Sequence, residues 1–171
     1  QDALYDCDWI PYEVFEKDMD IEGPELALRD ERYKVLIVPP VEAIPYPTLR
    51  KVKAFFDNGG IVLGYGFLPS KSATLGHASS EIGALVDAVW GSREPGLAVK
   101  KTNAAGGRSY LLPDKVTPEE IAQVLADDAS VRPVIEVLAG DTEDWLHVLH
   151  RVKDGRDIFF ICNQQHEGTA K

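Results

Sequence analysis

The sequence has few cysteines, a minority of basic residues and no long apolar run. Its two cysteines, Cys7 and Cys162, lie far apart without metal-ligand spacing, so we expect buried free thiols, with a disulfide between them left open. Lysine and arginine total 18 against 28 acidic residues, which gives a net charge of −10. This balance argues against nucleic acid or an anionic membrane as the main partner, because both require a basic surface.

The chain also has no signal peptide, and no segment approaches the ~20 apolar residues that a membrane-spanning helix needs. It begins at Gln1 without a methionine, and it ends soon after a hairpin pattern that has no further strands beside it. A lone hairpin is marginally stable in water. We therefore expect this sequence to be a piece cut from a longer protein, large enough for one domain with a core.

The first half of the sequence predicts a strand–helix–strand unit. Residues 33–39 and 61–66 are continuous apolar runs, typical of strands that are buried on both faces of a parallel sheet. Between them, residues 48–57 carry apolar side chains at helical spacing, with Thr48 as the expected N-cap and Gly59 at the exit. Short joints between the three elements favour a right-handed crossover.

Further elements alternate along the rest of the chain, whereas residues 1–31 are acidic and without a regular pattern. We expect helices at 79–90 and 117–129, strands at 97–101, 108–112 and 131–140, and a hairpin with arms 145–152 and 157–162. Thr117 and Glu120 are expected to form a capping box on the second helix, and Asp154-Gly155 is expected to make the hairpin turn. This order predicts a layered α/β fold with a mostly parallel sheet, followed by a C-terminal β-hairpin. We place the boundary after residue 140, which gives an α/β domain at 1–140 and a hairpin segment at 141–171.

No catalytic constellation is visible in the sequence. Neither apolar strand is followed by a glycine-rich phosphate loop, so we expect no dinucleotide or other cofactor, and no metal-ligand cluster appears. The turn after the second strand holds Tyr65, Gly66 and Phe67, none of them an ordinary nucleophile. Ser70 and Ser72 lie near His77, but this spacing is better explained by a solvated loop than by part of a catalytic triad.

Three stretches resemble one known setting. The sequences YKVLIVPP at 33–40 and IVLGYG at 61–66, joined by a helix into Asn58-Gly59-Gly60, look like the glutamine-amidotransferase-like (flavodoxin-like) domain of large multidomain glycoside hydrolases. The β-galactosidase trimerisation domain is one version of it. The sequence HRVKDGRDIFFICN at 150–163 resembles the passage that leads into the β-sandwich of α-L-rhamnosidase-like glycosidases of family 106.

The resemblance implies a class I glutamine-amidotransferase-like, flavodoxin-like three-layer sandwich whose partners are a catalytic barrel and a β-sandwich of the same protein. The catalytic carboxylates of such enzymes are expected in the barrel, so none is assigned to this chain. The amidotransferase nucleophile would fall in the turn that holds Tyr65 and Gly66, so we expect no amidotransferase activity. The resemblance also implies that the parent protein is exported from a bacterium, but the sequence itself gives no compartment.

These observations favour a non-catalytic accessory domain of a rhamnosidase-like glycoside hydrolase. The alternative is a carbohydrate- or small-ligand-binding module that uses the crevice at the strand ends, with Glu42, Tyr65 and Phe67 as candidate contacts. A third and weaker hypothesis is an independent hydrolase or transferase that uses Ser70 or Ser72. The hairpin is expected either to fold back onto the α/β sheet as an added edge, which the apolar Trp145 and Leu146 favour, or to contact a second copy of the chain.

Overall fold

The computed structural model of the protein describes residue 5, residues 7–128, residues 131, 133 and 135, and residues 146–163. The chain forms two compact units, one of residues 10–116 and one of residues 1–9 with 117–171. The expected boundary after residue 140 lies outside the described residues and stays a prediction.

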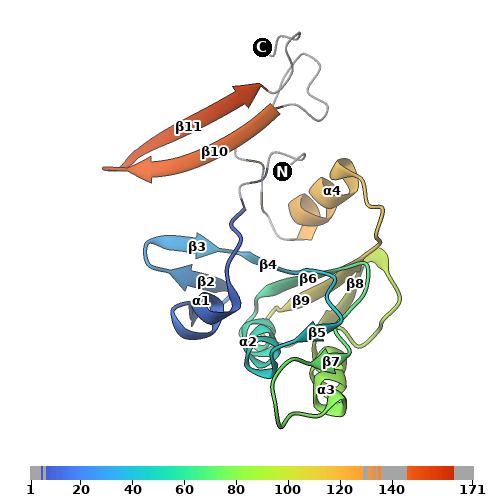
Figure 1. The fold of residues 1–171 in the computed structure, drawn as a ribbon. Helices are drawn as coiled ribbons and strands as arrows, with labels where there is room; N and C mark the ends of the chain where they lie inside the picture. The colour runs from blue at the N-terminus through green and yellow to red at the C-terminus, as the bar shows by residue number, and fades with distance from the viewer. Residues whose placement is uncertain are drawn as a thin grey trace. The chain divides into compact units, whose positions relative to one another are not determined.

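A four-stranded mixed sheet forms the centre of the first unit (Figure 1). Its strands, in spatial order, are β4 (Val35–Val38), β6 (Ile61–Tyr65), β9 (Arg108–Leu112) and β8 (Gly96–Thr102). The pairs β4–β6 and β6–β9 are parallel, and β8 runs antiparallel to β9. The predicted α/β class with a mostly parallel sheet is confirmed.

Helices α2 (Tyr46–Asp57) and α3 (Ser79–Val89) supply much of the core beside this sheet. The buried cluster joins them to β4, β6 and β9 through Val38, Val62, Leu111, Leu49, Val52, Phe55, Phe56, Ile82, Val86 and Val89. Two hydrogen bonds fasten the end of α3 to β9. Trp90 Nε1 donates to the carbonyl of Tyr110 at 2.9 Å, and Ser109 Oγ donates to the carbonyl of Val89 at 2.7 Å.

The two apolar strands differ in burial, contrary to the expectation for the first. Ile61, Val62 and Leu63 of β6 are buried, as predicted for a strand in the interior of a parallel sheet. Ile37 of β4 is 57% exposed. The reason is position: β4 is the edge strand of the four-stranded sheet, so the prediction that it is covered on both faces was wrong.

Helix α2 begins earlier than its capping pattern indicated. Its first residue is Tyr46, with Pro45 in the N-cap position and Pro47 in the first turn, where a proline needs no hydrogen-bond partner. Thr48 is therefore not the N-cap. It lies buried inside the first turn, and its hydroxyl donates to the carboxylate of Glu16. The predicted exit at Gly59 is confirmed by its left-handed φ of +98°.

The N-terminal part of this unit is more regular than its composition indicated. Helix α1 (Tyr12–Lys17) precedes an antiparallel sheet of β1 (Asp20–Glu22), β2 (Glu25–Leu28) and β3 (Glu31–Tyr33). The expectation of irregular structure through residue 31 was thus wrong. A further two-stranded parallel sheet joins β5 (Ala43–Ile44) to β7 (Lys71–Ser72).

The second unit contains helix α4 (Pro118–Asp128) and a hairpin of β10 (Leu146–Lys153) and β11 (Arg156–Asn163). Thr117 and Glu120 form the predicted capping box, with reciprocal hydrogen bonds of 2.8 and 3.2 Å. Asp154 and Gly155, with φ of +51° and +70°, make the predicted hairpin turn. The strand expected at 131–140 lies mostly outside the described residues.

Both cysteines are free and exposed, so the expectation of buried thiols was wrong. Cys162 lies on the exposed hairpin, and Cys7 lies before α1, outside any helix or strand. Among the residues that the structure describes, no helix is long and apolar enough to cross a membrane.

Candidate functional site

The candidate residues Glu42, Tyr65 and Phe67 all lie at or after the carboxyl ends of β4 and β6. These strands are parallel neighbours, so their ends meet at one edge of the sheet, where α/β folds bind ligands. The Tyr65 hydroxyl donates to the carbonyl of Asp114 at 2.6 Å, which ties the end of β6 to the segment after β9. Tyr65 is therefore already engaged within the chain.

Glu42 is also engaged in contacts within the chain. Its carboxylate pairs with Lys71 Nζ at 2.7 Å in an exposed ion pair. Its backbone carbonyl accepts hydrogen bonds of 3.0 Å from the amides of Ser70 and Lys71. Phe67, in contrast, is 50% exposed. Within the described part of the chain, no hydrogen bond, ion pair or ring contact links Glu42, Tyr65 and Phe67 to one another.

The turn after β6 has the backbone of a strained elbow but no nucleophile on it. Gly66 adopts a left-handed φ of +67°. A Cβ atom built on it would lie 1.9 Å from Asp114 Oδ1, so the Asp114 carboxylate fills the space where a side chain would project. The residue in the strained position thus has to be glycine. This explains why the sequence offers no competent nucleophile there.

Ser72 and His77 of the next loop also have local partners. Ser72 Oγ accepts from the amide of Thr74 and donates to its carbonyl, both at 3.1 Å, which closes a tight turn. The His77 ring stacks on Tyr46 with centroids 3.8 Å apart and planes 8° from parallel. His77 Nδ1 lies 3.1 Å from Glu81 Oε1, so its orientation is fixed within the loop.

The Glu81 carboxylate caps helix α3 in addition to holding His77. Its Oε2 accepts a hydrogen bond of 2.7 Å from the amide of Ala78, at the N-terminus of the helix. This bond and the one to His77 hold the pKa of Glu81 below its ordinary value of 4.5, because both favour the charged carboxylate. Helix capping and the contact with His77 thus explain why Glu81 lies here, without a catalytic role.

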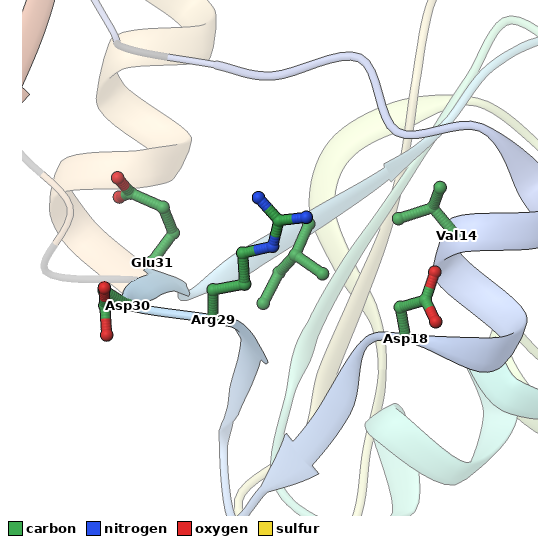
Figure 2. Close-up of a pocket in the computed structure, with 6 residues that line it drawn as sticks. Val14, Asp18, Arg29, Asp30 and Glu31 are labelled. Carbon is green, nitrogen blue, oxygen red and sulfur yellow. The ribbon is translucent and has the colours of Figure 1, made fainter.

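A concave site lies in a part of the chain where no site was expected. A pocket of about 710 Å³ lies between α1 and the turn that joins β2 to β3. Figure 2 shows Arg29 reaching into its middle, with Glu31 on one side and Val14 and Asp18 on the other. Its lining residues are Val14, Asp18, Leu28, Arg29, Asp30 and Glu31.

This pocket could not be predicted because its residues come from separate elements in a stretch without hydrophobic periodicity. The only sequence signal is the pair Arg29-Asp30 between two short β-rich runs, which fits a hairpin turn but not a site. Across the described residues, no group of three or more His, Cys, Asp or Glu side chains is arranged to hold a metal ion.

Solved structures with a similar fold are β-galactosidases. Gan42B, a GH42 β-galactosidase, shares 18% identity with a TM-score of 0.50, over 77% of this chain and 26% of that enzyme. A catalytic mutant of Gan42B from G. stearothermophilus shares 16% identity with a TM-score of 0.52, over 88% and 29%. The chain thus spans less than a third of the β-galactosidase in both structures, and the likeness shows the fold alone.

Comparison with protein families gives a more specific result. No curated protein matches the chain. The model of the glycoside hydrolase family 106, described as alpha-L-rhamnosidase, matches residues 2–171. The match covers essentially all of the sequence, and it includes all three stretches on which the resemblance was based. The chain therefore belongs to the α-L-rhamnosidase family 106 of glycoside hydrolases.

Proposed function

We propose that this chain is a non-catalytic accessory module of a glycoside hydrolase that acts on rhamnosides. The observation that carries the proposal is the elbow after β6, where Gly66 occupies the strained position and the Asp114 carboxylate fills the adjacent space. Family membership supplies the class of enzyme. At the sheet edge where an α/β fold would carry a nucleophile, the turn after β6 holds none.

The module's partners are a catalytic barrel and a β-sandwich in the same protein. Two facts support this: the chain spans 26% and 29% of the chains in two structures of one β-galactosidase whose fold it shares, and its hairpin carries exposed apolar side chains. Val152, Phe160 and Ile161 are 63%, 57% and 60% exposed. Side chains of this kind are covered in a β-sandwich by a facing sheet.

The finer fold that we propose is a flavodoxin-like, glutamine-amidotransferase-like three-layer sandwich. Its support is the run of parallel strands β4, β6 and β9 in sequence order, with α2 crossing between the first two. Leu63, Tyr110 and Leu112 are also buried, at 2%, 1% and 3% exposure. They alternate with the core-facing Val62 and Leu111, so both faces of the sheet are covered at these strands.

The test of the proposed function is an activity assay on the pure chain with aryl α-L-rhamnosides and aryl β-galactosides. We expect no turnover, because we expect the acid and nucleophile that glycosidases need to lie in the catalytic barrel of the parent protein. Turnover that co-purifies with the chain and disappears when one of its acids is replaced by an amide would contradict the proposal.

A second candidate is a ligand site in the strand-end crevice. The half-exposed ring of Phe67 favours it, because an aromatic face can stack on a sugar. Glu42 and Tyr65 would have to exchange their contacts with Lys71 and Asp114 for contacts with the ligand. Loss of oligosaccharide affinity in Phe67→Ala, with unchanged thermal stability, would support this site.

A further inference from the structure

The end of helix α2 carries a dipeptide with a reactivity of its own. Asn58 is exposed at the C-cap, and it directly precedes Gly59. Of the three asparagines in the sequence, it is the one that a glycine follows. The backbone nitrogen after an asparagine can attack the carboxamide carbon of its side chain, which contributes to the thermolability of asparagine. A glycine leaves this approach unhindered, because it has no Cβ.

The folded chain holds both reacting groups in other hydrogen bonds. Asn58 Nδ2 donates to the carbonyl of Ala54 at 2.8 Å, so the carboxamide lies back along the helix. The backbone nitrogen of Gly59 donates to the carbonyl of Phe56 at 3.0 Å, and Gly59 is buried. Ring closure would also require rotation about the Cα–C bond of Asn58, whose ψ is 12°, to bring this nitrogen beside the side chain. The closed end of α2 therefore protects Asn58.

A second asparagine holds this end closed from outside the helix. Asn103 follows β8, and its Nδ2 donates to the same carbonyl of Phe56 at 2.7 Å. Its Oδ1 accepts hydrogen bonds of 3.0 and 2.8 Å from the amides of Ala105 and Gly107, which fixes its orientation. Gly59 packs against this loop, because a Cβ built on it would lie 2.7 Å from the Ala105 carbonyl oxygen. The loop of residues 103–107, called the Asn103 loop below, is thus fastened to the last turn of α2.

We propose that Asn58 is a site of spontaneous deamidation and that the Asn103 loop sets its rate. When the last turn of α2 opens, a bond forms between Gly59 N and Asn58 Cγ, and the Cγ–Nδ2 bond breaks. The Nδ2 group leaves as ammonia with the proton that the Gly59 nitrogen gives up, and a five-membered succinimide remains. Water then adds to one of the two ring carbonyls. Addition at Cγ gives aspartate, and addition at the backbone carbon gives isoaspartate, in which the main chain runs through Cγ.

Both products oppose closure of the helix end. A carboxylate at position 58 lies at the negative end of the helix dipole, and it has no proton to donate to the carbonyl of Ala54. Isoaspartate also lengthens the main chain by one methylene group. Phe55 and Phe56, in the turn just before, are buried in the core, so the helix cannot shift to accommodate this extra length without loss of packing. Deamidation should therefore make the opening irreversible and lower the melting temperature of the chain.

The experiment follows deamidation of the whole chain at mildly alkaline pH. Mass spectrometry of the peptide that contains Asn58 detects the conversion of amide to acid, and an isoaspartate assay identifies the second product. We expect the reaction in urea to be faster than in the folded chain by about tenfold or more, a factor that an opening free energy of about 1.4 kcal/mol already gives. Asn58→Gln should abolish the reaction, because a glutamine would have to close a larger ring.

Asn103→Asp tests the role of the loop. The aspartate still accepts hydrogen bonds from Ala105 and Gly107 but cannot donate to the Phe56 carbonyl. Deamidation of Asn58 should therefore be about fivefold faster in the folded variant, the factor that one hydrogen bond contributes, and unchanged in urea. Ser92→Ala is the matched control. It removes a loop hydrogen bond, the one that Ser92 Oγ accepts from the amide of Glu94, without touching the Phe56 carbonyl, so it should leave the rate as it is.

Each part of the proposal has an outcome that would overturn it. Absence of deamidation at Asn58 even in urea would exclude the site. Equal rates in the folded and the unfolded chain would show that the end of α2 gives no protection. A rate that Asn103→Asp leaves unchanged in the folded chain would exclude the role of the loop. If thermal melts show that this variant does not fold, the unmodified chain in urea below its unfolding transition is measured instead, and a rate that stays constant there would contradict opening of the helix end.

Discussion

The ammonium group of Lys51 donates a hydrogen bond to the backbone carbonyl of Glu16, with 3.0 Å between nitrogen and oxygen. It also donates to the carbonyl of Met19, and it lies 5.5 Å from the centroid of the Phe15 ring. A single side chain of α2 therefore satisfies carbonyls at the end of α1 and fixes one wall of the pocket that Asp18 lines.

Replacing Lys51 should loosen this junction. We expect Lys51→Met to lower the free energy of unfolding by about 1–3 kcal/mol, the cost of leaving partly buried carbonyls without a donor. Lys53→Met is the control, since Lys53 makes an exposed ion pair with Asp57 one turn along the same helix. It should cost at most about 0.5 kcal/mol. Urea denaturation of both variants measures the difference, and equal losses would show that the Lys51 contacts contribute nothing specific.

Gly66 offers a test of the elbow after β6. Gly66→Ala places a Cβ in a left-handed conformation, at a cost of about 1–2 kcal/mol, and also drives it into the Asp114 carboxylate. Gly76→Ala is the matched control: Gly76 has a φ of +83°, and a Cβ added to it would meet no atom within 4 Å, so only the backbone cost applies. We expect the Gly66 variant to be clearly less stable in thermal melts. Equal melting temperatures would mean that Asp114 does not fill this space.

The core assignment predicts a large effect at Phe56. Its ring is 2% exposed and belongs to the main apolar cluster. Phe56→Ala should therefore cost about 3–5 kcal/mol, as large-to-small changes of buried aromatics do. Phe67→Ala, at a ring that is 50% exposed, should cost less than about 1 kcal/mol. A loss below ~1 kcal/mol for Phe56 would place its ring outside the core.

Glu81 gives the N-terminus of α3 a defined pH dependence. Its folded pKa is held below the ordinary 4.5, first by the Ala78 amide and then by His77. Because the folded pKa is lowered, the ionised Glu81 carboxylate stabilises the folded state. This stabilisation is complete above pH 4.5 and is lost as the pH falls through the lowered folded pKa. We expect the Ala78 amide signal to titrate in that acidic window, and Glu81→Gln to abolish the titration. A signal that titrates equally in both proteins would contradict this assignment.

Much of the fold follows from local sequence. The buried run at Ile61–Tyr65, the Thr117–Glu120 capping box and the Asp154-Gly155 turn are each decided by neighbouring residues, and all three were predicted. The strands β1, β2 and β3 were not, because each has only three or four residues, and most side chains of β1 and β3 are polar. Strands this short are specified by their pairing rather than by a period of their own.

The candidate site residues also divide into those that local sequence could place and those that depend on contacts distant in the chain. Tyr65 and Phe67 could be placed at the carboxyl end of a strand from the sequence, but the bond from Tyr65 to Asp114 joins segments that are distant in the chain. The pocket of Asp18 and Arg29 depends on a backbone conformation, a φ of +56° on an arginine, that propensities disfavour. A residue whose backbone conformation opposes its propensity cannot be predicted from that propensity.

The hairpin leaves one expectation untested and gives evidence for another. We expected β10 and β11 to extend the α/β sheet as an added edge, with Trp145 supporting that contact. Trp145 lies outside the described residues, and the two strands form a sheet of their own over the register from Leu146–Asn163 to Lys153–Arg156. An added edge on the four-stranded sheet therefore stays a prediction.

Apolar side chains are exposed on both faces of this ribbon. Phe159 and Val152 lie on one face, at 44% and 63% exposure, and Leu149 and Phe160 lie on the other, at 41% and 57%. Exposed ribbons of this kind pair with other chains unless charge protects them. In the isolated chain, with no β-sandwich to cover them, we expect these faces to drive contact with a second copy.

The final prediction is that the isolated chain self-associates through the hairpin. Sedimentation velocity should show a concentration-dependent increase in mass, and Phe160→Lys should shift the association to higher concentration, because a charge inserted in an apolar face opposes its burial. Phe67→Lys is the control, since it alters a similarly exposed ring away from the hairpin. Hydrogen exchange adds an independent measurement: protection of the amides of residues 146–152 and 157–162 should rise with protein concentration. Protection that is complete at the lowest concentration, together with a monomeric mass throughout, would show that the hairpin needs no partner.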